Sequence, residues 1–182
     1  METLGLSDST QRSEGFVKSL FWPSIQTATD VDYLGTQGYW VCTIVALLSL
    51  GVFVFTGHPI IGVLIFLLYY GGGVGVRQRS PYAAGIVFFI YLFETIFGPF
   101  SVLRIIITGL LLSNLRATWI ASNWKPDSEE AILPPRLNET FFDKVADQLP
   151  QWLWPRMRIL YYVYVILLLG LAVVGFAMFE RR

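Results

Sequence analysis

The sequence predicts an all-α integral membrane protein with five transmembrane helices, arranged as two tight helical hairpins followed by a C-terminal span. Three observations lead to this fold class: the composition, one apolar segment too long for a single crossing, and the distribution of basic residues. Of the 182 residues, 54% are hydrophobic and only 14% are charged, whereas soluble domains carry about 25% charged residues. The composition therefore indicates a chain that resides in a bilayer.

Residues 82–121 form the long apolar segment. As one helix they would reach roughly 60 Å at about 1.5 Å per residue, which is twice the roughly 30 Å of a hydrocarbon core. Proline lacks a backbone donor and disfavours a helical residue before it, so the step Gly98-Pro99 is the expected turn. We therefore expect spans over residues 82–97 and 100–121, which together form the second hairpin.

Residues 1–38 are polar and are predicted to be partly disordered, with a short interfacial stretch near their end. They lack the pattern of a signal peptide, so the first span, residues 39–56, is expected to be an uncleaved anchor. Gly57 suits a helix C-terminus and Pro59 suits the first position of the next helix. A tight turn is therefore expected between the first span and the second, residues 59–76.

Residues 122–156 are predicted to be a cytoplasmic loop. Asn138 is a suitable N-cap for an amphipathic helix over residues 138–149, which we expect to lie on the membrane surface, with docking on a partner or on the bundle as the alternative. The fifth span is expected over residues 157–179, with residues 180–182 as a tail. Six apolar side chains of the loop are predicted to be interfacial: Phe141, Phe142, Val145, Leu149, Trp152 and Trp154.

The basic residues decide the number of crossings, because short cytoplasmic loops are enriched in Lys and Arg. With five spans and a cytoplasmic N-terminus, ten bases fall inside, two fall outside, and Arg104 lies within the membrane near the outer face. If residues 82–121 crossed only once, the division would be six against six. Charge and length thus both favour five crossings, with the loop inside and the C-terminus outside.

Glu94 and Arg104 are the two ionisable residues well inside the long apolar segment, and each lies five residues from Pro99. Because ionisable groups within a span are costly unless paired or hydrated, we expect a structural ion pair that clamps the hairpin. Separate snorkelling to the interface and a proton or ion relay are the alternatives.

Gly71 and Gly75 have the small-xxx-small spacing that permits close helix approach, so we expect them to be packing positions. No Ser-His-acid set and no Cys/His metal spacing are present in the sequence, which has one His and one Cys. We therefore expect no catalytic site, no cofactor, no bound metal and no nucleic-acid partner.

Two stretches carry a resemblance to known proteins. One is Gly75-Val76-Arg77-Gln78-Arg79-Ser80-Pro81-Tyr82-Ala83-Ala84, followed by Asn114-Leu115-Arg116-Ala117-Thr118; the other runs from Pro135-Arg136-Leu137-Asn138-Glu139-Thr140 to Asp147-Gln148-Leu149-Pro150 and Trp154-Pro155. Together they resemble small multi-pass bacterial membrane proteins without an assigned function. The resemblance implies a bacterial inner-membrane location and no catalytic activity.

The leading functional hypothesis is a non-enzymatic scaffold or accessory subunit of a membrane assembly, which contacts the lipid bilayer and other membrane-protein subunits or copies of itself. Spans rich in large aromatic residues and glycine suit packing against further helices. The alternative is an oligomeric transporter or channel in which Glu94 and Arg104 face a hydrated cavity. A membrane enzyme acting on lipid is a third hypothesis.

Overall fold

The computed structural model describes residues 21–22, 25, 28–123 and 141–180, with the backbone alone for residues 28–29, 141–143 and 175–180. Within these residues the chain is helical and contains no strand. The helices are α2 (Ala28–Phe55), α3 (Pro59–Arg77), α4 (Pro81–Phe97), α5 (Val102–Asn123) and α6 (Phe141–Glu180).

Four stretches within these helices are long and apolar enough to cross a membrane, namely Asp30–Phe55, Pro59–Arg77, Val102–Asn123 and Lys144–Val174. The apolar helix α4 is shorter, with 17 residues. The predicted all-helical class and the membrane-compatible apolar helices are confirmed. Five membrane crossings remain a prediction, because length and composition identify only four long spans among the described residues.

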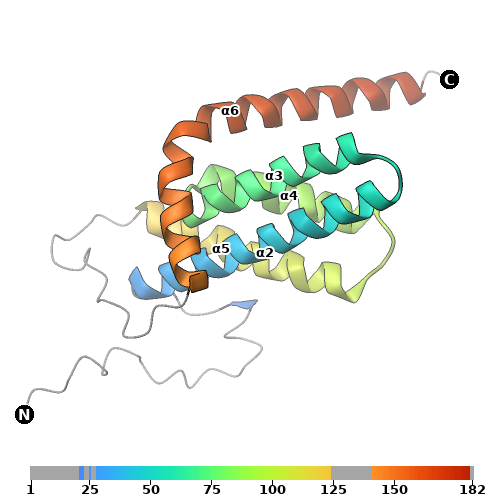
Figure 1. Cartoon of the computed structure of the whole chain (residues 1–182). Helices are drawn as coiled ribbons and strands as arrows, with labels where there is room; N and C mark the ends of the chain where they lie inside the picture. The colour runs from blue at the N-terminus through green and yellow to red at the C-terminus, as the bar shows by residue number, and fades with distance from the viewer. Residues whose placement is uncertain (1–20, 23–24, 26–27, 124–140, 181–182) are drawn as a thin grey trace, which may run out of the picture.

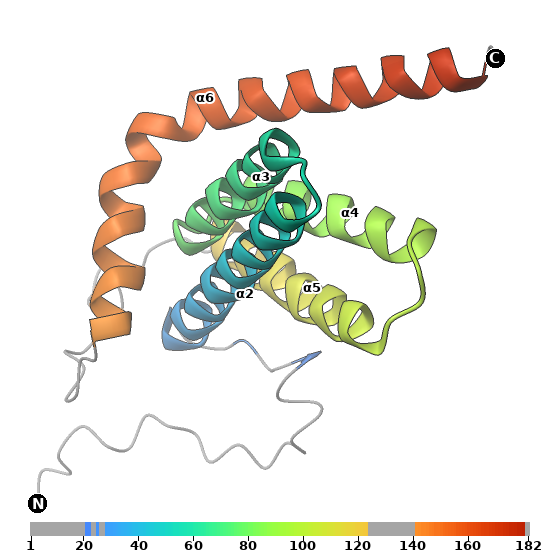
Figure 2. The ribbon, with the colours of Figure 1, turned by 45° about the vertical axis from the view of Figure 1, so that its right-hand side comes forward.

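Helices α2 to α5 form a bundle of two hairpins, α2–α3 and α4–α5, that lie side by side (Figure 1). Both hairpin turns are at one end of the bundle, which we call the hairpin end. The start of α2, the α3–α4 turn and the end of α5 are at the opposite end (Figure 2), which we call the arm end. Helix α2 packs most extensively on α3 and also contacts α5, while α3 contacts α4 and α6.

The two hairpin turns use glycine differently. Gly57 has a φ of 81°, in the left-handed region that glycine adopts without steric cost, and Pro59 is the first residue of α3. Gly98 follows α4 with a φ of −88°, which any residue can adopt. Glycine is therefore needed at position 98 because a Cβ atom there would collide with neighbouring atoms, and not because of the backbone conformation.

The first helix begins at Ala28, well before the predicted start at residue 39. Asp30 lies in its first turn, where a carboxylate interacts favourably with the positive end of the helix dipole. Asp32 is buried at the arm end, where its carboxylate pairs with Arg77 of α3. The polar character of this segment therefore reflects a buried ionic contact and not a solvated linker.

Helix α6 continues without interruption through the predicted boundary between the loop and the fifth span. It is sharply bent, so that its first part crosses the arm end and its second part follows α3 (Figures 1 and 2). Pro150 and Pro155 lie inside it, and proline is the usual cause of such bends because it removes an internal hydrogen bond. We call residues 141–153 the arm, because the buried side chains from Trp154 onward pack along α3.

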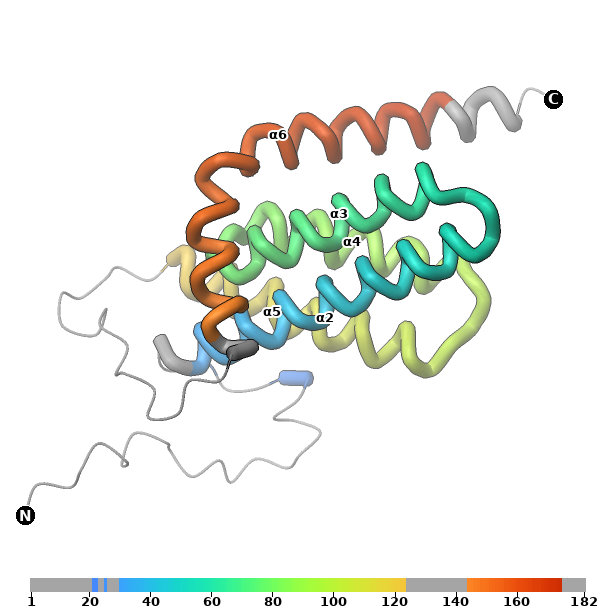
Figure 3. The backbone as a smooth tube through the Cα atoms, viewed as in Figure 1, coloured from blue at the N-terminus to red at the C-terminus, as the bar shows by residue number. Residues whose placement is uncertain are grey.

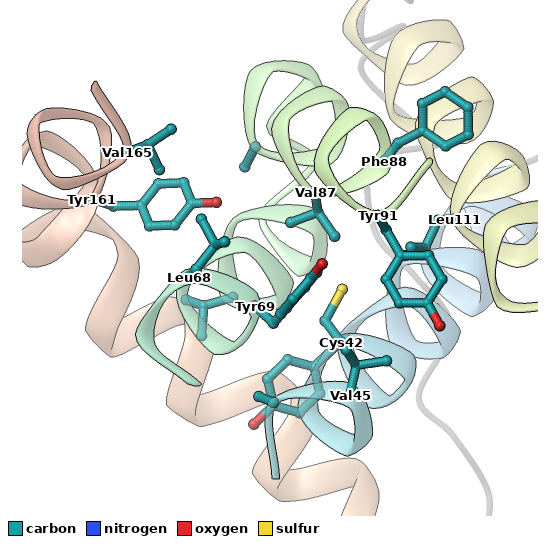
Figure 4. Close-up of a cluster of buried hydrophobic side chains, with 14 of the residues drawn as sticks. Cys42, Val45, Leu68, Tyr69, Val87, Phe88, Tyr91, Leu111, Tyr161 and Val165 are labelled. Carbon is teal, nitrogen blue, oxygen red and sulfur yellow. The ribbon is translucent and has the colours of Figure 1, made fainter. Parts of the chain in front are cut away.

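The core lies where α2, α3 and α4 meet α6, and Figure 4 shows its centre. Cys42 of α2, Tyr69 of α3 and Val87 of α4 are each fully or almost fully buried there. Tyr161 contributes to the same cluster from α6. The core thus joins the arm-bearing helix to both hairpins.

Candidate functional site

The glycine-rich end of α3, residues 71–75, is the point at which three other helices approach one backbone. A Cβ atom on Gly71, Gly72, Gly73 or Gly75 would come within 2.1–2.8 Å of a side-chain atom of Tyr161, Val87, Cys42 or Ala83, respectively. Real Cβ atoms do not approach other atoms so closely, so only glycine lets α2, α4 and α6 pack here. The structure thus places Gly71 and Gly75, the two glycines singled out in the sequence, at helix crossings.

Arg77, the last residue of α3, is the centre of a buried ionic cluster at the arm end. It is only 9% exposed, and its guanidinium lies 2.6 Å from the carboxylate of Asp32 in α2. It also pairs with the carboxylate of Asp147 in the arm. Arg77 lies just beyond the predicted second span, residues 59–76, and the structure includes it in α3. Two acids distant in the sequence neutralise it inside the fold.

Pro150 contributes to the ionic cluster around Arg77 because it leaves one backbone carbonyl of α6 without its helical hydrogen bond. Because proline has no N–H, the carbonyl of Ala146, four residues earlier, loses its partner within the helix. That carbonyl accepts a hydrogen bond of 3.3 Å from Nε of Arg77 instead. Arg77 therefore holds the arm by a carboxylate and by a carbonyl that the proline has freed.

The hairpin end contains the predicted pair Glu94 and Arg104, but not as an ion pair. The Arg104 guanidinium donates to the backbone carbonyl of Glu94 at 3.2 Å and to that of Pro99 at 3.4 Å. It does not pair with the Glu94 carboxylate within the part of the chain that the structure describes. The Glu94 carbonyl also accepts the backbone N–H of Gly98 at 2.9 Å, so the guanidinium adds a second hydrogen bond there. A cation is favoured at this negative end of the helix dipole.

Gly98 makes this cap possible. A Cβ at this position would lie 2.0 Å from the nearer guanidinium nitrogen of Arg104 and 2.4 Å from the carbonyl oxygen of Glu94. The Glu94 side chain itself is exposed, and its carboxylate is near the hydroxyl of Tyr69 in the core. The hairpin end is thus closed by a cation that caps a helix, with the acid directed elsewhere.

The predicted interfacial residues have different environments. Trp152 is 60% exposed and carries the guanidinium of Arg156 on its ring, and Leu149 is also exposed. Trp154 is only 9% exposed and packs against Gly75 and Tyr161, because the glycine leaves space for the indole in the core. Val145 is half-buried in the arm, and the side chains of Phe141 and Phe142 lie outside the described residues.

Further polar contacts hold α6 and the second hairpin in place. The hydroxyls of Ser80 and Tyr162 are 2.9 Å apart, and the Tyr164 hydroxyl donates to the carbonyl of Leu64. Thr95 and Thr108 join α4 to α5 through a 3.0 Å contact between their hydroxyls. The described side chains include no group of three or more His, Cys, Asp or Glu residues that could hold a metal ion.

Comparison with protein-family models, with curated proteins and with solved structures found no match to this chain. The sequence identified the glycines of α3 but missed the cluster around Arg77. The signal in the sequence was that the acids Asp32 and Asp147 stand next to long apolar helices, where an acid is costly unless it has a basic partner.

Proposed function

We propose that this protein is a five-crossing membrane protein of the bacterial cytoplasmic membrane with its arm end on the cytoplasmic side. Helix α4 would be about 26 Å long at the usual rise, close to the roughly 30 Å of a hydrocarbon core. Among the basic residues that the structure describes, six lie at the arm end and one, Arg104, lies at the hairpin end, which supports this orientation through the positive-inside rule. The six are Arg77, Arg79, Arg116, Lys144, Arg156 and Arg158.

Reporter fusions test this orientation. A reporter inserted near Ser128 is expected to report the cytoplasm, and one fused to the C-terminus is expected to report the opposite side. The same side for both positions would contradict five crossings.

Within this topology we propose a non-enzymatic role as a scaffold or accessory subunit of a membrane assembly. The observation that carries the proposal is the second half of α6. Beyond Val165, whose side chain is buried, its large apolar side chains are mostly exposed, including Ile166, Leu171 and Val173. In Figure 3 this part of α6 runs alongside α3, so that α3 lies on one side of it. A span with one neighbour over part of its length leaves a long surface on which another membrane helix can pack.

Site-specific photo-cross-linking in native membranes tests the scaffold role. A photoreactive residue at Leu171 is expected to give a discrete protein adduct, whereas one at the similarly exposed Ile105 of α5 is expected to react with lipid only. Protein adducts at neither position, or equally at both, would contradict a partner surface on α6.

An oligomeric transporter or channel is the second candidate, and one observation favours it. Arg104, Thr108, Asn114 and Thr118 share one face of α5 by helical spacing. The Oδ1 atom of Asn114 is buried and has no hydrogen-bond partner within the described part of the chain. Ion flux into liposomes containing the purified protein, and its loss in Glu94→Gln, would support this candidate over the scaffold.

A further inference from the structure

The end of α3 has an arginine where the backbone geometry favours glycine. The N–H of Arg79 donates to the carbonyl of Val76 at 3.0 Å, and the N–H of Ser80 donates to that of Gly75 at 3.0 Å. This pair of bonds is the Schellman motif, in which the residue at the position of Arg79 is left-handed and is usually glycine. Arg79 indeed has a φ of 56°, the one positive φ of a non-glycine residue in the described chain.

A strained backbone at an exposed arginine points to a role for its side chain. A left-handed conformation costs free energy for any residue with a Cβ, and such strain is often found at functional positions. The side chain of Arg79 is exposed, so packing in the core does not explain the choice of residue.

Helix α6 contacts the same turn and carries a second arginine, Arg158, one helical turn from that contact. Tyr162 of α6 touches the hydroxyl of Ser80, the residue next to Arg79. Arg158 precedes Tyr162 by four residues and so lies on the same flank of α6, one turn away. Its side chain is exposed, as is that of Tyr82 at the start of α4, which is 76% exposed.

We propose that this basic flank, formed by Arg79, Arg158 and Tyr82, binds the phosphate headgroup of an anionic phospholipid. Two guanidinium groups are suited to phosphate oxygens, and basic pockets between membrane helices on the cytoplasmic side are known binding sites for anionic lipids. Tyrosine is favoured at the level of the headgroups. The described acidic side chains lie elsewhere: Asp30 and Asp32 at the start of α2, Asp147 on Arg77, and Glu94 at the hairpin end.

Arg156 provides a matched control within the same helix. It is two residues from Arg158, so it points about 200° away around α6. Its guanidinium is exposed, stacks on Trp152 and donates to the Trp152 carbonyl. Replacing it removes the same charge from the same end of the molecule while leaving the basic flank intact.

The test measures phospholipid binding to the purified full-length chain by native mass spectrometry. Phosphatidylglycerol or phosphatidylcholine is added in equal amounts to detergent micelles of wild type, Arg79→Gly, Arg158→Gln and Arg156→Gln. We expect wild type to prefer phosphatidylglycerol, and Arg79→Gly and Arg158→Gln each to weaken its binding about fivefold. Arg156→Gln is expected to bind like wild type.

Arg79→Gly also separates binding from folding. Glycine is more favourable in the left-handed conformation, so the thermal unfolding midpoint without added phosphatidylglycerol is expected to equal or exceed that of wild type. A lower midpoint would show a structural role for Arg79 and overturn the proposal. Equal losses of binding in Arg156→Gln and Arg79→Gly would also overturn it, because they would indicate a diffuse attraction to the whole basic end, and so would unchanged binding in Arg79→Gly.

Discussion

Replacing Arg77 is expected to be among the most destabilising single changes that the structure allows. Its guanidinium contacts the carboxylates of Asp32 and Asp147 and the carbonyl of Ala146, and thereby joins α3 to α2 and to the arm. In Arg77→Leu both acids lose the guanidinium of Arg77. The side chain of Asp32 is 9% exposed, whereas that of Asp147 is 27% exposed and can turn to water more easily.

The magnitude follows from this burial. Removing one partner of a buried ion pair costs about 3–5 kcal/mol, because the remaining charge stays buried without compensation. We therefore expect Arg77→Leu to lower the free energy of unfolding by about 3–5 kcal/mol, with most of the loss due to Asp32. Arg77→Leu combined with Asp32→Asn is expected to lose less than the sum of the two single changes, since the buried carboxylate that Arg77 pairs with is then absent.

The assay is reversible unfolding of the purified protein in mixed micelles by titration with sodium dodecyl sulfate, which reports the free energy of unfolding. Arg156→Leu is the control, because Arg156 is an exposed arginine of the same region, and surface changes usually shift stability by less than about 0.5 kcal/mol. A loss below about 1 kcal/mol in Arg77→Leu, or strict additivity with Asp32→Asn, would refute the buried cluster as a major source of stability.

Three further predictions use the same unfolding measurement. Gly72→Ala should cost about 1–3 kcal/mol through overpacking, whereas Gly51→Ala, where a Cβ meets no atom within 4 Å, should be neutral or stabilising; equal effects would contradict the crossing geometry. Glu94→Gln and Arg104→Gln should be nearly additive, because the guanidinium binds the backbone of Glu94, and a large coupling would indicate a carboxylate contact. Tyr162→Phe should lose about 0.5–1.5 kcal/mol with its hydroxyl contact to Ser80, and an unchanged stability would show that this contact contributes nothing.

The positions of the hairpin turns could be read from the sequence, because they depend on local chemistry. Gly57 and Pro59 favour a turn through their own backbone preferences, and Pro99 prevents α4 from continuing. The lengths of the apolar segments are likewise local properties. By contrast, the helices α2 and α6 begin well before the predicted spans at residues 39 and 157, because distant contacts stabilise their polar starts.

The predicted ion pair between Glu94 and Arg104 shows where sequence spacing was insufficient. Equal distance from Pro99 brought the two residues to the same depth, and the structure brings them together. Spacing alone does not include the backbone carbonyls of Glu94 and Pro99, which compete with the carboxylate for the guanidinium. A backbone acceptor already in place needs no side-chain ordering, and Gly98 leaves the space for the cap.

By itself, the sequence determined that this chain is helical, that its helices suit a bilayer, and where its hairpins turn, because hydrophobic content and the backbone preferences of glycine and proline act within a few residues. Only the tertiary structure decided that Arg77 is buried between Asp32 and Asp147, that Trp154 belongs to the core, and that Tyr162 of α6 contacts Ser80 beside Arg79. These arrangements depend on which helix faces which, and that choice is made by packing around the glycines of α3 and by the bend of α6.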